Sequence, residues 1–301
     1  MTTIILIHGI NNHDNSREDI ERNWSMALRE GLAKIGVSLP GNAGFRTVYY
    51  AEVLKERADT WGAASDAATP MSATSPASDL INRDIARIYL EYQRAYGITD
   101  EQVRQELPPE DDQDFVALAD GIHKSWIKAL ARVLERIVPI AAKPAASLFL
   151  GQAAAYLHRP GTKEQIDDLV LAQAFDNWPG DDTIIVSHSL GTVIAYDLLR
   201  RLRHSHRCKL LLTCGSPLGI DIVRDRLGPP LSCLPNVVEW INVSDPEDFV
   251  ALRTSLNATT FGCDEVVNHA DVDNGDADAH DIREYLKHRP VAKALARTIP
   301  T

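Results

Sequence analysis

The chain has 301 residues, of which 45% are hydrophobic and 24% are charged, so it can bury a full core in one large α/β domain with an insertion or in two small domains. We expect one domain with an inserted cap. The formal net charge of −11 excludes the backbone of a nucleic acid as the main partner, because such binding depends on clustered Lys and Arg side chains.

The first predicted element is a buried parallel strand at residues 3–7, a continuous apolar run that stops at His8-Gly9. Apolar residues then recur at helical spacing across residues 17–35, and Gly36 stands where a helix would end. We predict that Trp24 packs into the core from this helix. Residues 45–51 are the next expected strand.

A long segment without strand patterns follows, at residues 52–159. Residues 52–78 predict a mobile loop or hinge, and a flexible segment rich in Ala, Ser and Pro lies near residues 63–78. The remainder predicts helices at residues 80–96, 115–138 and 144–157. The segment is too long for a connection between two strands, so we predict a helical cap or lid over the active site.

The most apolar stretch of the chain is residues 137–157. Two prolines, a lysine and a glutamine interrupt it, which argues against a transmembrane helix. Buried cap helices are the preferred interpretation. The alternative is an apolar lid face that makes transient contact with a membrane or a long acyl chain.

A helix predicted at residues 162–178 leads into the most informative stretch, residues 183–197. It begins as a run of β-branched residues, passes through small residues and continues as an apolar helix. A strand, a sharp turn and a helix lift one side chain off the edge of a parallel sheet. That side chain would be Ser189, with the small residues Ser187 and Gly191 on either side.

This stretch resembles the nucleophile elbow of the α/β-hydrolase superfamily, usually Gly-x-Ser-x-Gly, with Ser187 at the first small position. The chain is most similar to the minimal, lipase- and esterase-like branch with a helical cap insertion. The resemblance implies an α/β-hydrolase fold with a mainly parallel central sheet of about six strands and helices on both faces. Residues 1–51 and 160–301 would form this core, and residues 52–159 the cap.

The same resemblance assigns the oxyanion hole. A strand that ends in His-Gly carries a loop whose backbone amide forms half of the hole in this superfamily, and residues 8–12 look like that loop. The amide of Ile10 is the expected donor from the loop. Its partner would be the amide of Leu190, directly after the nucleophile.

The acid is expected after a strand at residues 237–243, which follows another strand at residues 209–213. A serine nucleophile needs a base, and the base needs a carboxylate to fix its tautomer. Asp248 resembles the acid in the Asp-x-Val pattern of lipase-like members and is preferred. Asp245 is the alternative acid, although an Asx turn ahead of a proline would also explain it.

The base comes last in the chain order of the superfamily, which leaves three histidines. A last strand is predicted at residues 264–268, and a long loop then leads to His280 at the start of a helix. Since the superfamily carries its histidine on such a loop, we assign His280. The alternatives are His269, at a strand end, and His288, which is more typical of a solvated helix terminus.

The resemblance implies a serine hydrolase that cleaves carboxylic esters through an acyl-enzyme, with a lipid or apolar acyl ester as the small-molecule substrate. The same triad would serve a thioesterase or an amidase. A hydrolase-fold protein that binds or senses a ligand without turnover is the non-enzymatic alternative. The oligomeric state is open.

No cofactor or metal is predicted, because the aspartates of residues 271–278 lack the EF-hand frame and no HExxH motif occurs. The apolar run at residues 4–7 is too short for a signal peptide, so a cytoplasmic location is expected. Without CxxC spacing, the four cysteines are predicted to be reduced core thiols: Cys208, Cys214, Cys233 and Cys263.

Overall fold

The computed structural model describes residues 2–41, 43–66, 76–107, 124–137, 152–153, 155–157, 159–202, 205–252, 255–275 and 278–299. In this part of the chain one six-stranded sheet has the order β2-β1-β3-β4-β5-β6, and every neighbouring pair is parallel. The predicted α/β fold with a parallel sheet is confirmed. The strands are β1 (Thr3–Ile7), β2 (Gly44–Val48), β3 (Thr183–His188), β4 (Leu210–Cys214), β5 (Trp240–Val243) and β6 (Val267–His269).

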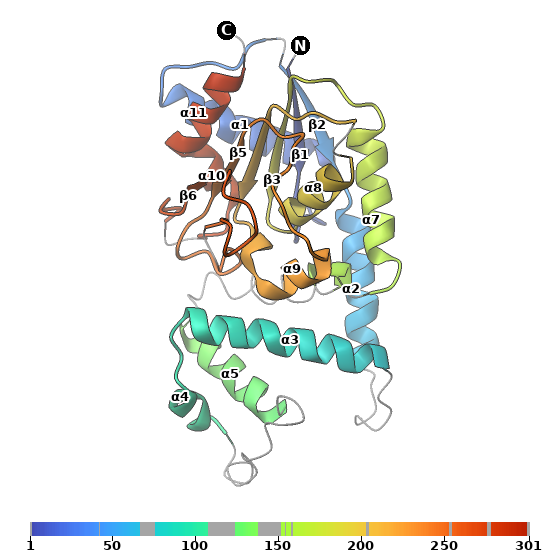
Figure 1. Cartoon of the computed structure of the whole chain (residues 1–301), viewed down its shortest axis with the longest axis vertical. Helices are drawn as coiled ribbons and strands as arrows, with labels where there is room; N and C mark the ends of the chain where they lie inside the picture. The colour runs from blue at the N-terminus through green and yellow to red at the C-terminus, as the bar shows by residue number, and fades with distance from the viewer. Residues whose placement is uncertain are drawn as a thin grey trace.

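Helices cover both faces of the sheet, because successive residues of its central strands alternate between two apolar cores (Figure 1). Ile4 of β1 packs on one face with α1 (Arg17–Ala33), α10 (Ile282–Lys287) and α11 (Arg289–Thr298). Ile5 belongs to the other core, with α7 (Thr162–Val170), α8 (Leu190–Arg201) and α9 (Asp221–Leu227). Burial on both faces explains why these strands are continuous apolar runs.

Several strands differ in length from their sequence patterns. The strand predicted at residues 237–243 begins only at Trp240, because Val237 forms an isolated bridge to Cys208 and Val238 is 59% exposed. The strand predicted at residues 45–51 ends at Val48, since the amide of Tyr50 donates to the ring of His8. The last strand is shifted, to Val267–His269.

The prediction of a loop at residues 52–78 is wrong where the structure describes it. Residues up to 66 belong to α2 (Ala51–Asp66), and α3 (Pro76–Ala95) begins before residue 78. Ala51 and Leu54 are buried, and the guanidinium Nε of Arg57 donates to Gln165 of α7 at 3.0 Å. Tertiary contacts therefore stabilise a helix whose composition alone resembles a loop. Residues 67–75 lie outside the described residues.

Between β2 and β3 the chain also forms α4 (Asp100–Arg104) and α5 (Lys124–Ile137). Figure 1 shows α3, α4 and α5 beyond α9, at the end of the sheet where the strands terminate. Tyr92 of α3 stacks on Phe249 with ring centroids 4.0 Å apart, and its hydroxyl donates to the Phe249 carbonyl at 2.7 Å. These helices thus share one apolar core with the sheet. The predicted boundary at residues 52–159 stays a prediction.

Most of the apolar stretch at residues 137–157 lies outside the described residues, and so do residues 108–123 of the predicted cap. Among the helices that the structure describes, none has the length and apolar character needed to cross a membrane.

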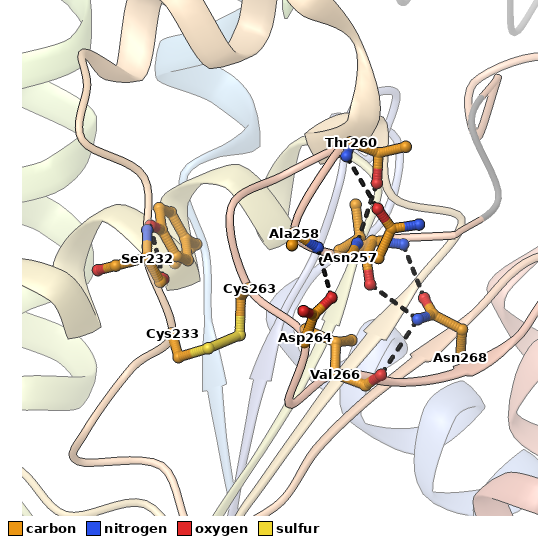
Figure 2. The surroundings of a disulfide bond; sticks show 11 residues. Ser232, Cys233, Asn257, Ala258, Thr260, Cys263, Asp264, Val266 and Asn268 are labelled. Carbon is orange, nitrogen blue, oxygen red and sulfur yellow. Dashed lines mark hydrogen bonds between the residues drawn. A yellow bond between two sulfur atoms is a disulfide. The ribbon is translucent and has the colours of Figure 1, made fainter.

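The prediction of four reduced cysteines is wrong for two of them. Cys233 and Cys263 form a disulfide, with Cα atoms 4.8 Å apart, whereas Cys208 and Cys214 are free and buried. Figure 2 shows that the segment around Cys263 is held by hydrogen bonds, among them one from the Ala258 amide to Asp264. Thirty positions separate the paired cysteines in the sequence, which is why spacing alone did not indicate the bond.

Candidate active site

Ser189 occupies a sharp turn between β3 and α8, with φ 52° and ψ −129°. A positive φ is strained for a residue with a side chain, at a cost of about 1–3 kcal/mol. A Cβ at Gly191 would lie 2.4 Å from the carbonyl oxygens of both Ile7 and His8, so the turn requires glycine there. Ser187 fits at the other small position because its hydroxyl donates to the Leu212 carbonyl at 2.8 Å.

The loop after β1 lies directly against this turn. A Cβ at Gly9 would lie 2.5 Å from the Cβ of Ser189, so only glycine allows the approach. The Asn12 side chain donates to the Ile10 carbonyl at 2.8 Å and shapes the loop. Apart from bonds within the regular helices and strands, no backbone hydrogen bond of the described residues has the amide of Ile10 or Leu190 as its donor. Both amides are therefore candidate donors to a ligand.

His8 is a structural residue of this loop, a role that goes beyond the His-Gly pattern noted in the sequence. Its Nδ1 lies 2.7 Å from the Gly9 carbonyl oxygen, and its Nε2 accepts from the Tyr50 amide at 3.2 Å. The Tyr50 hydroxyl in turn donates to the His8 carbonyl. Burial lowers the pKa of His8 to about 4, so the ring is neutral and joins β1 to the residues after β2.

His280 and Asp248 form a buried pair, with Nδ1 of the ring 2.8 Å from Oδ2 of the carboxylate. Burial by itself raises the pKa of Asp248, but attraction to His280 and hydrogen bonds from His280, Tyr285 and Val250 hold that pKa below its ordinary value. The carboxylate is therefore ionised at neutral pH and fixes the orientation of the imidazole.

Asp245 has a different role in the structure. Its Oδ1 accepts from the Glu247 amide at 2.7 Å, as in an Asx turn, and its Oδ2 accepts from the Asn274 amide at 2.6 Å. Of the other candidate bases, His288 contacts the Asn274 side chain through Nε2 at 2.9 Å, and His269 ends β6. The structure brings Asp248, and not Asp245, to His280.

Ser189 Oγ and His280 Nε2 are both buried, and neither has a hydrogen-bond partner among the described residues. Two polar atoms of complementary type without partners are unusual in a protein interior and are typical of a site that completes its hydrogen bonds with a ligand. His188, next to Ser189, brings the two segments together, since its ring centroid lies 4.4 Å from that of His280.

Two further residues support the pair and were not singled out from the sequence for this role. The Tyr285 hydroxyl donates to Asp248 Oδ2 at 2.7 Å. A Cβ at Gly215 would lie 2.7 Å from the same oxygen and 3.1 Å from His280 Nδ1. In the sequence, Gly215 is marked only by its position directly after a buried strand, where the loops of a parallel sheet line the site.

Within the described part of the chain, no three His, Cys, Asp or Glu side chains gather in a way that could hold a metal ion. A scan against protein-family models, a search of curated proteins and a search of solved structures each found no match.

Proposed function

We propose that this chain is a serine hydrolase of the α/β-hydrolase superfamily, with Ser189 as the nucleophile, His280 as the base and Asp248 as the acid. The observation that carries the proposal is the strained turn at Ser189, whose hydroxyl is buried without a partner among the described residues. The ring of the preceding residue, His188, lies 4.4 Å from that of His280, which is paired with the Asp248 carboxylate and whose Nε2 also has no partner there. This combination of strain, burial and an oriented imidazole has a direct explanation in acyl transfer.

The proposed mechanism has two steps. His280 Nε2 takes the proton of Ser189 as Oγ attacks the ester carbonyl, and the amides of Ile10 and Leu190 stabilise the oxyanion, each contributing about 3 kcal/mol. The same proton then passes to the leaving alcohol, and water releases the acid from the acyl-enzyme. The reaction needs a hydrogen bond between the Ser189 hydroxyl and His280 Nε2, and neither atom has another partner among the described residues.

The substrate class follows from the resemblance and from the helices beyond α9. We propose a carboxylic ester with an apolar acyl part, from a lipid or a short-chain acid, because the segment expected to form the cap is rich in Ala, Leu and Ile. Thioesters and amides would follow the same chemistry, and only turnover separates them. Transient membrane contact through residues 137–157 remains part of this proposal.

The disulfide in the structure argues against the cytoplasmic location that the sequence predicts. The Cys233–Cys263 disulfide is typical of proteins that fold in an oxidising compartment, because cytosolic thiols are kept reduced. Free-thiol counting of the protein purified under native conditions would separate the two locations: four thiols per chain fit the cytosol, and two fit an oxidising compartment.

The test of the proposed function is covalent labelling with a fluorescent fluorophosphonate, which reacts with a serine only where a base and an oxyanion hole activate it. We expect the wild type to be labelled and Ser189→Ala to be unlabelled. Ser25→Ala is the matched control, because its hydroxyl lies on the exposed surface of α1 and should not matter. A folded wild type that stays unlabelled, with and without lipid, would favour a ligand-binding or sensor protein.

A further inference from the structure

A cavity of about 300 Å³ opens beside the candidate triad, and its lining is mostly polar. It lies between the loop after β1, the first half of α1 and the residues that precede and begin α10. His188 and His280 both line it, so it reaches the candidate base and the residue that precedes Ser189. The side chains that this argument uses are Asn11, Asn23, His188, Asp278, Asp281 and Arg283.

The position of the cavity suits the alcohol half of an ester substrate. This argument rests on the proposed function. His280 must give its proton to the oxygen of the leaving alcohol, so this alcohol has to lie against that ring. Since His280 lines the cavity, the alcohol part of the substrate extends into it. The acyl part remains on the side of the apolar helices.

His188 sets the hydrogen-bonding character of the cavity. The residue is only 7% exposed, and burial, followed by repulsion from His280, lowers its pKa to about 3, so the ring is neutral. Its Nε2 is buried and has no partner in the described part of the chain. A neutral ring can offer a lone pair at this nitrogen to a donor from a ligand.

Two asparagines add groups that both donate and accept. No hydrogen bond within the described residues uses the side-chain amide of Asn11 or Asn23, whereas Asn12 and Asn15 bond to each other at 3.3 Å. The free amides and the ring lone pair together match hydroxyl groups, which can donate and accept at once.

The charges around the cavity exclude an anionic group. Asp278 and Asp281 both line it, and the one arginine of the lining, Arg283, is engaged by Asp281 through two contacts of Nε, at 3.0 and 2.9 Å. A phosphate or sulfate in this cavity would face carboxylates with no unpaired guanidinium to balance its charge.

We infer that this cavity binds an uncharged alcohol rich in hydroxyl groups, such as glycerol or a sugar, as the leaving group of the ester. His188 Nε2 accepts a hydrogen bond from one hydroxyl, and the amides of Asn11 and Asn23 contact others. The inference adds the alcohol class to the proposed function and leaves the acyl class as it stands.

The experiment compares four butyrate esters that differ only in the alcohol: ethanol, glycerol, choline and glycerol phosphate. We expect kcat/KM for the glycerol ester to exceed that for the ethyl ester by about tenfold or more, the effect of one or two added neutral hydrogen bonds. Equal values for these two esters, or a preference for the choline or glycerol phosphate ester, would overturn the inference.

Asn23→Leu tests the site itself, because the residue lies near the surface of α1 and its replacement leaves the triad intact. We expect the variant to lose the preference for the glycerol ester over the ethyl ester. Met26→Leu is the matched control, since it introduces the same side chain at an exposed position of α1 and should preserve the preference. An unchanged preference in Asn23→Leu would count against the assigned contacts.

Fluorophosphonate labelling separates the two ideas. Labelling of the protein without a preference for the glycerol ester over the ethyl ester would contradict only the inference about the alcohol. The absence of both labelling and hydrolysis would contradict the proposed function. Free glycerol gives a second readout, because it should slow the labelling of the wild type and of Met26→Leu but not that of Asn23→Leu.

Discussion

The hydroxyl of Tyr285 connects the two aspartates that compete for the role of acid, and its removal in Tyr285→Phe tests that connection. It donates to Oδ2 of Asp248 at 2.7 Å and accepts from the amide of Asp245 at 3.0 Å. The variant loses a charge-assisted hydrogen bond, worth roughly 1.5–3 kcal/mol, and leaves a buried amide without its acceptor, for about 1–3 kcal/mol more. We expect the free energy of unfolding to fall by about 3–4 kcal/mol at pH 7, measured by urea denaturation.

The pH dependence of this loss identifies its cause. Burial raises the pKa of Asp248. Attraction to His280 and the hydrogen bonds from His280 and Tyr285 lower it by a larger amount, so the pKa of Asp248 in the folded chain is depressed. Stability from a depressed pKa is fully present above the value of the unfolded carboxyl, about 3.9, and is lost as pH falls through the folded value. The depression is smaller in Tyr285→Phe, so the difference in the free energy of unfolding between this variant and the wild type should narrow as the pH falls below about 4.

Tyr92→Phe is the matched control. Its buried hydroxyl also donates at 2.7 Å, but to the neutral carbonyl of Phe249, so its loss should cost about the same at every pH. If the loss of free energy of unfolding in Tyr285→Phe is also the same at every pH, the hydroxyl does not act on an ionised Asp248 and the reasoning fails.

Replacing the disulfide with alanines at Cys233 and Cys263 should lower the free energy of unfolding by about 3.5 kcal/mol, the chain-entropy estimate for a loop of 30 residues, as measured by urea denaturation without reductant. Equal stability of variant and wild type would show that the bond is absent in solution. Asp248→Ala should lower kcat of ester hydrolysis by about four orders of magnitude, because the imidazole loses its orientation and the partner of its cation, whereas Asp245→Ala should affect mainly the free energy of unfolding. The opposite pattern would make Asp245 the acid.

The central strands could be predicted from the sequence because burial on both faces leaves a continuous apolar run. β1 and β4 have this character, and each was predicted to within a residue at either end. α2 could not be predicted, since its stability comes from contacts of Leu54 and Arg57 with residues far away in the chain. Local composition does not report such contacts.

The candidate site, too, could be predicted only in part from the sequence. Ser189, His280 and Asp248 could be proposed from motifs and chain order, and the structure brings the last two within hydrogen-bond distance. The contribution of Tyr285 depends on how α10 is rotated about its axis, and the cavity depends on how α1 meets the residues before α10. Neither is encoded in a local pattern, because both depend on packing between segments that are distant in sequence.

The order of the strands also affects how the chain can fold during synthesis. Ile7 of β1 pairs with Ser187 of β3, 180 positions further along, so β1 pairs with β2 long before its second partner has been made. At about 5–20 residues per second, the ribosome needs roughly 10–35 s to reach β3. Throughout that interval one edge of an apolar strand has no neighbour, which exposes the nascent chain to aggregation. The two halves of the candidate oxyanion hole, Ile10 and Leu190, can come together only after β3 has been synthesised.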